Sequence, residues 1–580
     1  MKDPIIITNA ALCHDCYRCV RNCNVKAIRI KEGQAQIVRE LCIVCGTCVR
    51  VCPQKAKGVH SAKEDVLQAV AAGKKVVASV APSAPACFDI RHFSQMEGAL
   101  KSLGFFAAEE TAVGAEIVAL AHREHIEQTP ERRPLITSAC PVVVNLVEQY
   151  YPDLIPHLAP IVSPMIAHGR LLAQKYGPDA FIVFIGPCIA KKKEIIEEPL
   201  RGVIHAAMTF EWLQECLHEA KIEFSPPPLQ TPTGNASDAG GELHEKARLF
   251  PLEGGLIATA RMKTDILGEE MIVASGLDAC QETLNDIRTG ALTGGLIELM
   301  ACKGGCINGP RLGDNTGGVL LARQKIIHFN SGRQPDIQIS REAWPLLERT
   351  LQNKKVPTPE FSDEQIREVL HRVNKFTPDD ELNCGACGYL SCREKAVATL
   401  SGMAEMTMCI PYMRRRSESL RQVVMDVVPD PILIVNDNLT IQDISPAAER
   451  LFSCKLKDVA GRHLSTLFPV LEDFIRVRDT GEPVIGKTRR IRGDIIAEQT
   501  IVRVEKQGLL LAILRDITER EKEREKFNAL RGETLERTHE VVSKQMRVAH
   551  EIAKLLGETT AESKMIVSRL AKLLEGEGNP

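Results

Sequence analysis

Cysteine is the residue type with the clearest chemistry in this 580-residue chain, which contains 20 cysteines. Sixteen of them lie in regular runs or in short motifs that complement one another, a grouping typical of metal sites in a large chain rather than of disulfides. Their thiolate forms bind iron and zinc. The four that stand alone are predicted to be buried small hydrophobic residues: Cys87, Cys216, Cys280 and Cys454.

Two runs near the N-terminus, "CHDCYRCVRNCN" and "CIVCGTCVRVCP", share the spacing C-x2-C-x2-C-x3-C. They resemble the runs of bacterial two-cluster ferredoxins, in which the fourth cysteine of each run binds the other cluster. Structural zinc is the alternative. Asn24 stands where the usual motif has proline, which is expected to affect the local turn more than ligation. The resemblance implies two 4Fe–4S clusters, held by Cys13, Cys16, Cys19 and Cys52, and by Cys42, Cys45, Cys48 and Cys23.

A third group lies in "NCGACGYLSCREKAVATLSGMAEMTMCIPYM". The segment 393–408 is predicted to be a helix, which would bring the last cysteine back beside the first three. The pattern resembles the small iron–sulfur domain found in several multicentre redox proteins. Zinc stays an alternative, because a C-x2-C pair serves both metals. The four candidate ligands are Cys384, Cys387, Cys392 and Cys409.

The remaining cysteines lie in three separate segments, "TSACP" (137–141), "GPCIAKKKE" (186–194) and "ELMACKGGCING" (298–309). They are too far apart in sequence for a local metal knuckle, so a folded domain must assemble any shared site. In this order the segments are similar to the signature loops of iron-only hydrogenases, TSCCP, MPCxxKKxE and ExMACxxGCxxG. The similarity spans roughly residues 60–375.

This resemblance implies an H-cluster, in which a 4Fe–4S part is bridged to a two-iron subcluster carrying carbonyl, cyanide and an azadithiolate. Cys306 would form the bridge, Lys191 would hydrogen-bond one cyanide, Pro82 and Ser83 would line the other, and Met300 would pack against the subcluster. The implied fold is α/β, with two twisted parallel sheets flanking the cluster, and apolar runs such as "AFIVFIG" agree with it. The implied ligands of the 4Fe–4S part are Cys140, Cys188, Cys302 and Cys306.

Three positions depart from the catalytic members of that family. Ala139 replaces the cysteine that passes protons to the azadithiolate amine, and a methyl group can neither donate nor accept a proton. Gly186 replaces a methionine, and Ala159 aligns with a relay serine. In "LAHREHI" the candidates to replace a relay glutamate are Glu124, His122 and His125. Because acid–base steps contribute about 100-fold to 10,000-fold each, slow turnover is expected.

The character of the chain changes from Arg421 onward. "VVMDVVPDPILIVNDNLTIQDISPAAERLF" is predicted to form a helix, two short strands joined by "NDN", and a second helix. "QTIVRVEKQGLLLAILRDITERE" is predicted to form a strand pair that ends at Asp516–Glu519. This order resembles a PAS domain, a sensory and dimerising module, over about residues 418–520. No ligand pattern for haem or flavin accompanies it.

A charged helix follows, and its apolar positions form a stripe suited to pairing with another helix. Gly557 is predicted to end this helix, and the capping-box spacing of Thr559–Glu562 to start a second helix that reaches Leu574. A dimerising hairpin is favoured over an effector-docking surface or a phosphoacceptor role for His550. The stripe consists of Leu535, Val542, Met546, Ala549, Ile552 and Leu556.

Composition limits the remaining possibilities. The length exceeds that of one hydrophobic core. A net charge of −2, from 73 basic and 75 acidic residues, argues against a nucleic-acid-binding surface. The sequence shows neither a signal-peptide pattern nor an apolar stretch long enough to cross a bilayer, so a cytoplasmic protein without a membrane span is expected.

The expected organisation is multidomain, α/β and α+β. The expected function is a low-activity, mainly regulatory iron-only hydrogenase that detects dihydrogen or a linked redox state, uses three 4Fe–4S clusters plus the H-cluster, and signals through the PAS domain and helices. Expected partners are dihydrogen, protons, a redox protein such as ferredoxin, a kinase or phosphatase, and a second copy of the chain. The alternatives are a catalytic ferredoxin-linked hydrogenase and a non-enzymatic iron–sulfur redox sensor without the two-iron subcluster. The predicted domains are 1–58 (two-cluster ferredoxin-like), 59–375 (H-cluster), 376–416 (4Fe–4S), 417–520 (PAS) and 521–580 (helical dimerisation or output).

Overall fold

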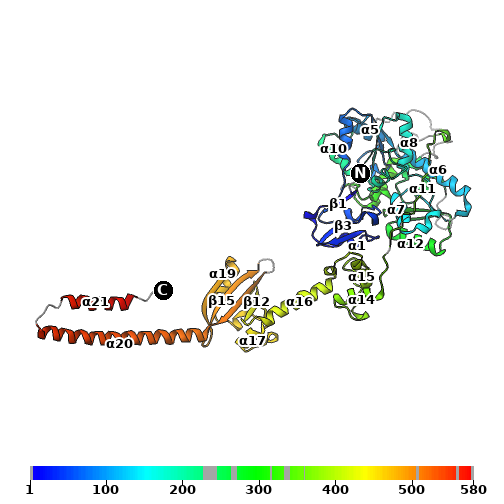
Figure 1. Cartoon of the computed structure of the whole chain (residues 1–580). Coiled ribbons are helices and arrows are strands. Elements are labelled where there is room, and N and C mark those ends of the chain that lie inside the picture. The colour runs from blue at the N-terminus through cyan, green and yellow to red at the C-terminus, as the bar shows by residue number, and fades with distance from the viewer. Residues whose placement is uncertain are drawn as a thin grey trace. The chain divides into compact units, whose positions relative to one another are not determined.

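The structure is a computed structural model of the whole chain (Figure 1). It forms two compact units, Met1–Met413 and Arg414–Pro580. No helix among the described residues is long and apolar enough to cross a membrane. The structure describes residues 4–132, 134–225, 245–262, 271–313, 317–331, 340–357, 359–504, 508–556 and 561–576.

The N-terminal part of the first unit is built from two short antiparallel strand pairs and two one-turn helices. β1 (Ile6–Thr8) pairs antiparallel with β4 (Lys57–Val59), and β2 (Ile28–Lys31) with β3 (Gln34–Ile37). The helices α1 (Arg18–Arg21) and α2 (Thr47–Arg50) each lie within one cysteine run. The two halves therefore repeat the same local structure, as expected from the repeated cysteine spacing.

The first large sheet has the strand order β6-β5-β8-β9, and all of its pairings are parallel. The central strand β8 (Phe181–Ile185) is a continuous apolar run, and β5 (Val76–Val80) is apolar apart from Ser79 and buried throughout, as parallel strands covered on both faces must be. The outer strands are β6 (Ala107–Glu110) and β9 (Ala206–Met208). The helices of this region are α3 (Lys63–Ala71), α4 (Ala84–Cys87), α5 (Phe93–Ser102), α6 (Ala112–Gln128), α8 (Pro164–Tyr176), α9 (Lys191–Glu194) and α10 (Phe210–Glu219).

The second sheet has the order β10-β11-β7 and is also parallel. Its strands are β7 (Leu135–Ile136), β10 (Met271–Ser275) and β11 (Leu296–Met300). Two twisted parallel sheets in an α/β unit were predicted, and this prediction is confirmed. The helices of this region are α7 (Pro141–Tyr150), α11 (Gly255–Thr259), α12 (Leu277–Thr289) and α13 (Val319–Ser331).

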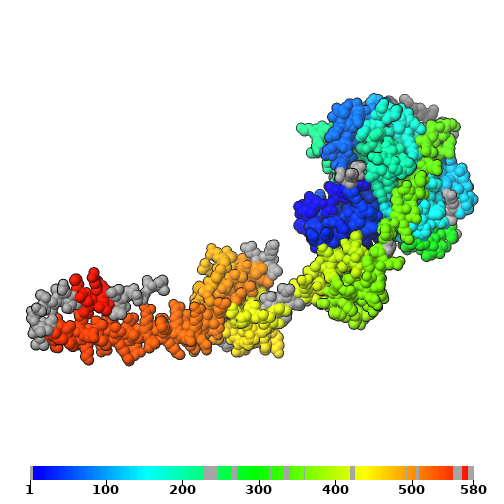
Figure 2. Space-filling model, viewed as in Figure 1, coloured from blue at the N-terminus to red at the C-terminus, as the bar shows by residue number. Residues whose placement is uncertain are grey.

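The segment that carries the third cysteine group packs α14 (Asp363–Arg372) against α15 (Cys392–Leu400) through a small core that includes Leu370 and Ala396. The predicted helix over 393–408 was too long. The chain turns after Leu400, where Gly402 adopts a φ of +69°, and a separate 3₁₀ turn (Met406–Met408) leads to Cys409. In Figure 2 this segment lies against the dark blue N-terminal residues, and the Ile30 amide donates to the Met403 carbonyl.

The second unit contains a five-stranded antiparallel sheet in the order β13-β12-β16-β15-β14. The predicted helix–strand–strand–helix order and the later strand pair are confirmed. The sheet covers an apolar core with Phe452, Phe468 and Phe474 at its centre. The strands are β12 (Ile432–Asn436), β13 (Ile441–Ile444), β14 (Val484–Arg492), β15 (Ile495–Val504) and β16 (Leu509–Asp516), and the helices are α16 (Ile410–Val427), α17 (Pro446–Phe452), α18 (Leu456–Val459) and α19 (Glu472–Thr480).

Two helices follow this sheet, α20 (Thr518–Leu556) and α21 (Ala561–Gly576). Within the predicted stripe on α20, Leu535 and Ile552 are exposed in the single chain, and Val542 and Met546 are partly exposed. An apolar stripe of this kind fits a helix that pairs with another helix. The predicted stop at Gly557 and the predicted cap at Thr559 lie outside the described residues.

Three of the four isolated cysteines behave as predicted. Cys87, Cys216 and Cys280 are buried, whereas Cys454 is only partly buried against the core of the second unit. Burial raises the pKa of the Cys87 and Cys280 thiols to about 12. These thiols are therefore uncharged and suit apolar surroundings.

Candidate metal and redox sites

The three scattered cysteine segments meet at one cavity of about 70 Å³ in the first unit. Each segment directly follows a parallel strand: "TSACP" follows β7, "GPCIAKKKE" follows β8, and "ELMACKGGCING" begins in β11 and continues past its end. Loops at the carboxyl ends of parallel strands commonly form ligand sites. The two sheets thus bring four cysteines to the cavity lining: Cys140, Cys188, Cys302 and Cys306.

These four thiols influence one another electrostatically. Burial and, to a smaller degree, the nearby Cys140 thiol together raise the pKa of Cys188 to about 11. Burial also raises the pKa of Cys302 and of Cys306, and their neighbouring thiols add to both shifts. Four thiolates this close need cationic metal to stay charged, since metal binding and thiol deprotonation are coupled. The donor set therefore fits a cluster with four thiolate ligands.

A single zinc ion would require a specific, tighter arrangement of these four sulfurs. Zinc–sulfur distances of about 2.3 Å require the four sulfurs to lie close together in a tetrahedron. Within the ranges that the structure describes, no group of three or more His, Cys, Asp or Glu side chains is arranged to hold one metal ion. A cysteine-lined cavity leaves space for a larger group than one ion.

Lys191 lines the same cavity and is held by an ion-pair network. Its Nζ lies 2.9 Å from Oε2 of Glu194, and Nη1 of Arg349 lies 3.2 Å from Oε1 of the same carboxylate. Burial alone would raise the pKa of Glu194, but the two cations outweigh it and the pKa is lowered. The network thus fixes a charged lysine at the cavity wall.

The lysine run is not a solvated charge cluster. Lys191 and Lys192 are both buried, and Nζ of Lys192 donates to the Ala207 carbonyl over the ring of Trp212. Burial lowers the pKa of Lys192 to about 7. Its role is therefore internal packing and backbone support.

The other predicted cluster contacts are only partly brought to the cavity. Met300 lines it, at the end of β11. Pro82 and Ser83 follow β5 and are not among the residues that line the described cavity. Ser83 is fully buried, and its Oγ has no hydrogen-bond partner among the described residues. A buried hydroxyl without a partner is expected where a polar ligand completes the site.

Ala139 lines the cavity beside Cys140, so the departure from the catalytic motif lies at the site itself. Ala159 is buried, and its amide donates to the Ile136 carbonyl just before the same loop. Gly186 is also constrained, because a Cβ atom there would lie 2.7 Å from the ring of Phe184. The Phe184 ring therefore occupies the position next to the missing methionine side chain.

The candidate relay groups lie on α6 in different environments. His122 is buried, its Nδ1 donates to the Val118 carbonyl at 2.7 Å, and its Nε2 accepts the Ser138 amide at 3.3 Å. Burial lowers its pKa to about 4, so it is a neutral acceptor that supports the backbone next to Ala139. Glu124 instead forms an ion pair with Arg341 at 2.7 Å, near solvent.

The N-terminal cysteines form two groups, one of which mixes the two runs. Burial raises the pKa of Cys23 to about 11, and the Cys45 thiol adds to this shift. Burial likewise raises the pKa of Cys42 to about 12, with Cys45 and Cys23 as neighbours. Burial also raises the pKa of Cys48, and the thiols of Cys45, Cys42 and Cys23 add to this shift. The fourth cysteine of the first run therefore lies with the second run, as the ferredoxin resemblance implies.

The other N-terminal group contains Cys13, Cys16 and Cys19. Burial raises the pKa of Cys19, Lys57 opposes this shift, and the Cys13 and Cys16 thiols add to it. Membership of Cys52 in this group stays a prediction. Cys16 is exposed, so this group reaches the protein surface.

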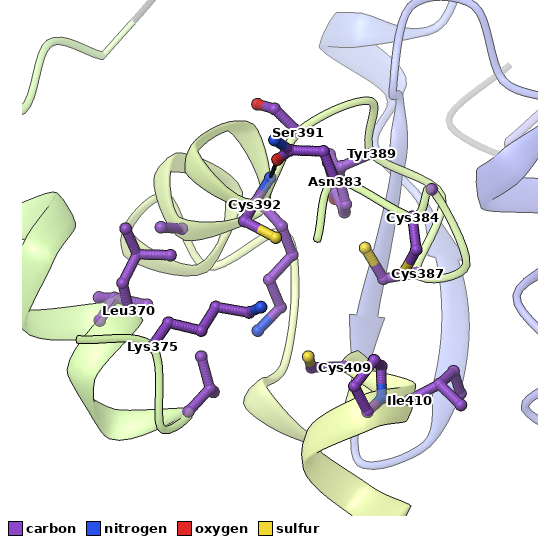
Figure 3. Close-up of a pocket in the computed structure, with 16 residues that line it drawn as sticks. Leu370, Lys375, Asn383, Cys384, Cys387, Tyr389, Ser391, Cys392, Cys409 and Ile410 are labelled. Atoms are coloured by element: carbon purple, nitrogen blue, oxygen red, sulfur yellow. Dashed lines mark hydrogen bonds between the residues drawn. The ribbon is translucent and has the colours of Figure 1, made fainter. Parts of the chain in front are cut away.

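The third cysteine group surrounds a smaller cavity, of about 30 Å³ (Figure 3). Figure 3 shows Cys384 and Cys387 on one loop, Cys392 at the start of α15 and Cys409 before α16. The Cys392 amide donates to Oδ1 of Asn383 at 2.7 Å, which ties the helix start to the loop. Two lysines, Lys375 and Lys395, also line the cavity and are buried. Burial lowers the pKa of Lys395, and the thiols of Cys409, Cys387 and Cys392 oppose this shift.

Close side-chain contacts connect the three regions within the first unit. Cys45 lines the 70 Å³ cavity, and a Cβ atom at Gly46 would lie 2.7 Å from both Ile189 and Pro310. On the other side, Gly388 packs so closely against α1 that a Cβ atom would lie 2.9 Å from Val20. The group around Cys23 and Cys45 therefore lies between the other two sites.

Tyr389 lies at the second of these junctions. Burial raises its pKa to about 12, and the thiols of Cys387 and Cys23, one from each group, add to the shift. Nζ of Lys26 is 6.0 Å from the centre of its ring. Arg21 donates to the carbonyls of Ala386 and Cys16, each at 3.0 Å. The junction is thus closely packed.

Comparison with family models identifies the parts of the chain. Residues 74–310 match the model of the iron-only hydrogenase large subunit, C-terminal domain. This part of the chain is an iron-only hydrogenase-like domain. Around this hydrogenase domain, residues 12–57 match a 4Fe–4S dicluster domain, 380–411 a putative Fe–S cluster, and 419–517 the PAS fold.

Curated relatives of the hydrogenase domain differ in their names. The periplasmic Fe hydrogenase large subunit of Nitratidesulfovibrio vulgaris is 27% identical over 262 residues, which cover 37% of this chain and 61% of the relative. The cytosolic Fe–S cluster assembly factor NAR1 of Kluyveromyces lactis is 32% identical over 99 residues, 17% of this chain and 21% of the relative. The match therefore spans less than two thirds of either relative's length.

Among solved structures, the FeFe-hydrogenase HydA1 of Chlamydomonas reinhardtii matches with 18% identity and a TM-score of 0.37. The match covers 51% of this chain and 100% of that chain.

Sequence reasoning missed three features of these sites. Arg349 lies 155 residues from Glu194, and no local pattern connects them. The position of Cys45 at the hydrogenase cavity depends on how two domains pack. Lys395 could have been found, because it follows Cys392 by three residues, and helical spacing places such residues on one face.

Proposed function

We propose that this protein is a sensory iron-only hydrogenase that detects dihydrogen, or a redox state linked to it, and turns hydrogen over slowly. The observation that carries the proposal is Ala139 in a cavity that has the four cysteines of a hydrogenase site. The ligand set argues for a complete metal centre, while the alanine removes the group next to it that would transfer protons. A complete site with impaired proton transfer suits sensing better than turnover.

Cys140, Cys188, Cys302 and Cys306 would hold the H-cluster, with Cys306 as the bridge to its two-iron part. When bound, this group supplies the site where dihydrogen is split into protons and electrons or formed from them. Lys191 would offer its ammonium group to a cyanide, held in place by Glu194 and Arg349. The apolar wall formed by Met300, Phe250 and Leu256 would exclude water.

Electrons would leave the hydrogenase domain through Cys45 and its cluster. The Cys45 thiol lines the hydrogenase cavity, and Tyr389 lies near both Cys23 and Cys387. This order favours a route from the H-cluster through the Cys42, Cys45, Cys48 and Cys23 cluster to the third cluster. The group with Cys16, which is exposed, would exchange electrons with a redox partner such as ferredoxin.

The output would pass to the second unit of a cytoplasmic homodimer. The third cysteine group ends at Cys409, and α16 begins at the next residue and precedes the PAS sheet in sequence. The exposed apolar stripe on α20 supports pairing of two chains. A kinase or phosphatase would read the resulting change.

Infrared spectroscopy of the matured protein tests the metal site. Bands of bound carbonyl and cyanide are expected, and their absence after maturation with the hydrogenase maturation machinery would reject the H-cluster. Hydrogen exchange of the PAS domain and α20 under dihydrogen and under argon, at matched potential, tests sensing. Identical exchange in both gases would reject detection of dihydrogen itself.

A non-enzymatic iron–sulfur protein is the second candidate, favoured by the likeness to a relative named as an assembly factor. It predicts iron–sulfur signals without carbonyl or cyanide bands. A catalytic ferredoxin-linked hydrogenase predicts the bands together with fast dihydrogen evolution, which Ala139 argues against.

A further inference from the structure

The cavity of the third cysteine group has an unusual charge balance. Lys395 is 4% exposed, and its Nζ has no hydrogen-bond partner among the described residues. Lys375 is also 4% exposed, and its Nζ donates to the Asp380 carbonyl. Among the residues that line the cavity, none is Asp or Glu. Two buried amines therefore face four thiols without a carboxylate between them.

Burying an ammonium group without a partner is costly, so buried lysines normally pair with an anion. Figure 3 shows the Lys375 side chain reaching toward the space between the sulfurs of Cys392 and Cys409. Lys395 extends from the same helix as Cys392, and it acts electrostatically on the Cys387 thiol. The anion that fits these amines is a four-thiolate metal cluster, whose net charge is negative.

We propose that Lys395, with Lys375, raises the reduction potential of the third cluster and makes it the electron-storing centre next to the PAS domain in sequence. A cluster becomes more negative by one charge on reduction, and nearby positive charge and hydrogen bonds to sulfur stabilise the reduced form. The electron comes from the Cys42, Cys45, Cys48 and Cys23 cluster, which is oxidised by one electron in the same step. The inference rests on the proposed function, in that this site holds a 4Fe–4S cluster.

The other candidate cluster sites lack this arrangement. Lys57 acts on Cys19 and Cys48, but its Nζ already donates to Oγ1 of Thr8 and to the Ala35 carbonyl, each at 2.6 Å. The positive charge of Lys191 is compensated by the Glu194 carboxylate, 2.9 Å away. Lys395 differs from both. Among the described residues that line its cavity, only the thiols that would bind the cluster can compensate its charge.

The test is a redox titration of the full-length reconstituted protein, followed by electron paramagnetic resonance. The signal of the third cluster is assigned by its loss in Cys384→Ala. Lys395→Met is expected to lower the midpoint potential of that signal and leave the other clusters unchanged, while Lys395→Arg keeps it close to the wild-type value. Arg393→Gln is the matched control, since Arg393 lies on the same helix but is exposed and paired with Asp363.

An intact third cluster with an unchanged midpoint in Lys395→Met would overturn the proposal. If Lys395→Met loses the cluster, Lys375→Met decides, and an unchanged midpoint there overturns the proposal equally. Metal analysis of the wild type distinguishes a wrong assignment of the cluster from a wrong role of the lysines. Zinc at this site would overturn the cluster and the lysine proposal together, whereas iron with an unchanged midpoint overturns the lysine proposal alone.

Discussion

The Nζ of Lys191 and Oε2 of Glu194 lie 2.9 Å apart at the wall of the hydrogenase cavity, and both side chains are buried. Glu194 also binds Arg349, which comes from a segment 155 residues later in the chain. The carboxylate therefore links the one-turn helix α9, just after β8, to the distant segment that carries Arg349. These ion pairs therefore connect two segments of the fold even without a bound metal group.

Replacing Arg349 with Met is expected to destabilise the first unit. Removal of one partner of a buried ion pair costs about 3–5 kcal/mol, and Lys191 would still compensate part of the charge on Glu194, so the loss should fall near the lower end of that range. Scanning calorimetry of the full chain measures it. Arg201→Met is the control, because Arg201 and Glu198 form an exposed pair that is worth about 1 kcal/mol or less.

Ala139→Cys is expected to raise dihydrogen evolution of the matured protein. The new thiol restores a proton donor at the cavity, and such a step contributes about 100-fold or more when the rest of the relay is intact. A smaller gain is expected here because Ala159 also lacks a polar group. Ala139→Val adds volume without a proton donor and should give no gain; equal rates for the Cys and Val variants would contradict the role of the thiol.

Gly186→Met is expected to destabilise the first unit, because the new Cβ would lie 2.7 Å from the Phe184 ring and 3.0 Å from Ala81. Overpacking of this kind costs about 1–3 kcal/mol. Phe184→Ala in the same chain should relieve part of the cost, since residues in contact are not additive. The thermal midpoint of unfolding is the measurement, and strictly additive losses would show that the two side chains do not compete.

The stability of the PAS domain is expected to fall in acid because of Asp473. Burial would raise the pKa of this carboxyl, but Lys487 at 2.5 Å and Arg489 at 3.1 Å outweigh it and lower the pKa. A carboxyl with a lowered folded pKa contributes stability above its unfolded pKa, about 3.9, and loses it as the pH falls through the folded value.

Hydrogen exchange of β14–β16 between about pH 5 and pH 3 measures this effect. Asp473→Asn should be less stable at pH 5 and lose less stability on acidification than the wild type. The control is Asp479→Asn, since Asp479 has an exposed side chain and pairs with the neighbouring Arg478. Parallel pH dependence in the wild type and Asp473→Asn would contradict the prediction.

The sequence by itself determined the domain types and the candidate ligands. Regular cysteine spacing and three ordered motifs specify local loops, and apolar runs specify buried parallel strands, so both could be read without a structure. Four strands of the PAS sheet were predicted for the same reason, since their patterns and turns are local, whereas the edge strand β14 was not predicted. The length of the helix after Cys392 was misjudged because the turn at Gly402 interrupts an otherwise helical pattern.

Only the tertiary structure decided which distant groups meet. It brought Arg349 to Glu194, Cys45 to the hydrogenase cavity, and Tyr389 close to both Cys23 and Cys387. Such contacts depend on how separate elements pack, and no local spacing encodes them. It also placed the Nζ of Lys395 near thiols instead of water. Burial strengthens the electrostatic effect of this charge, and the sequence does not specify burial.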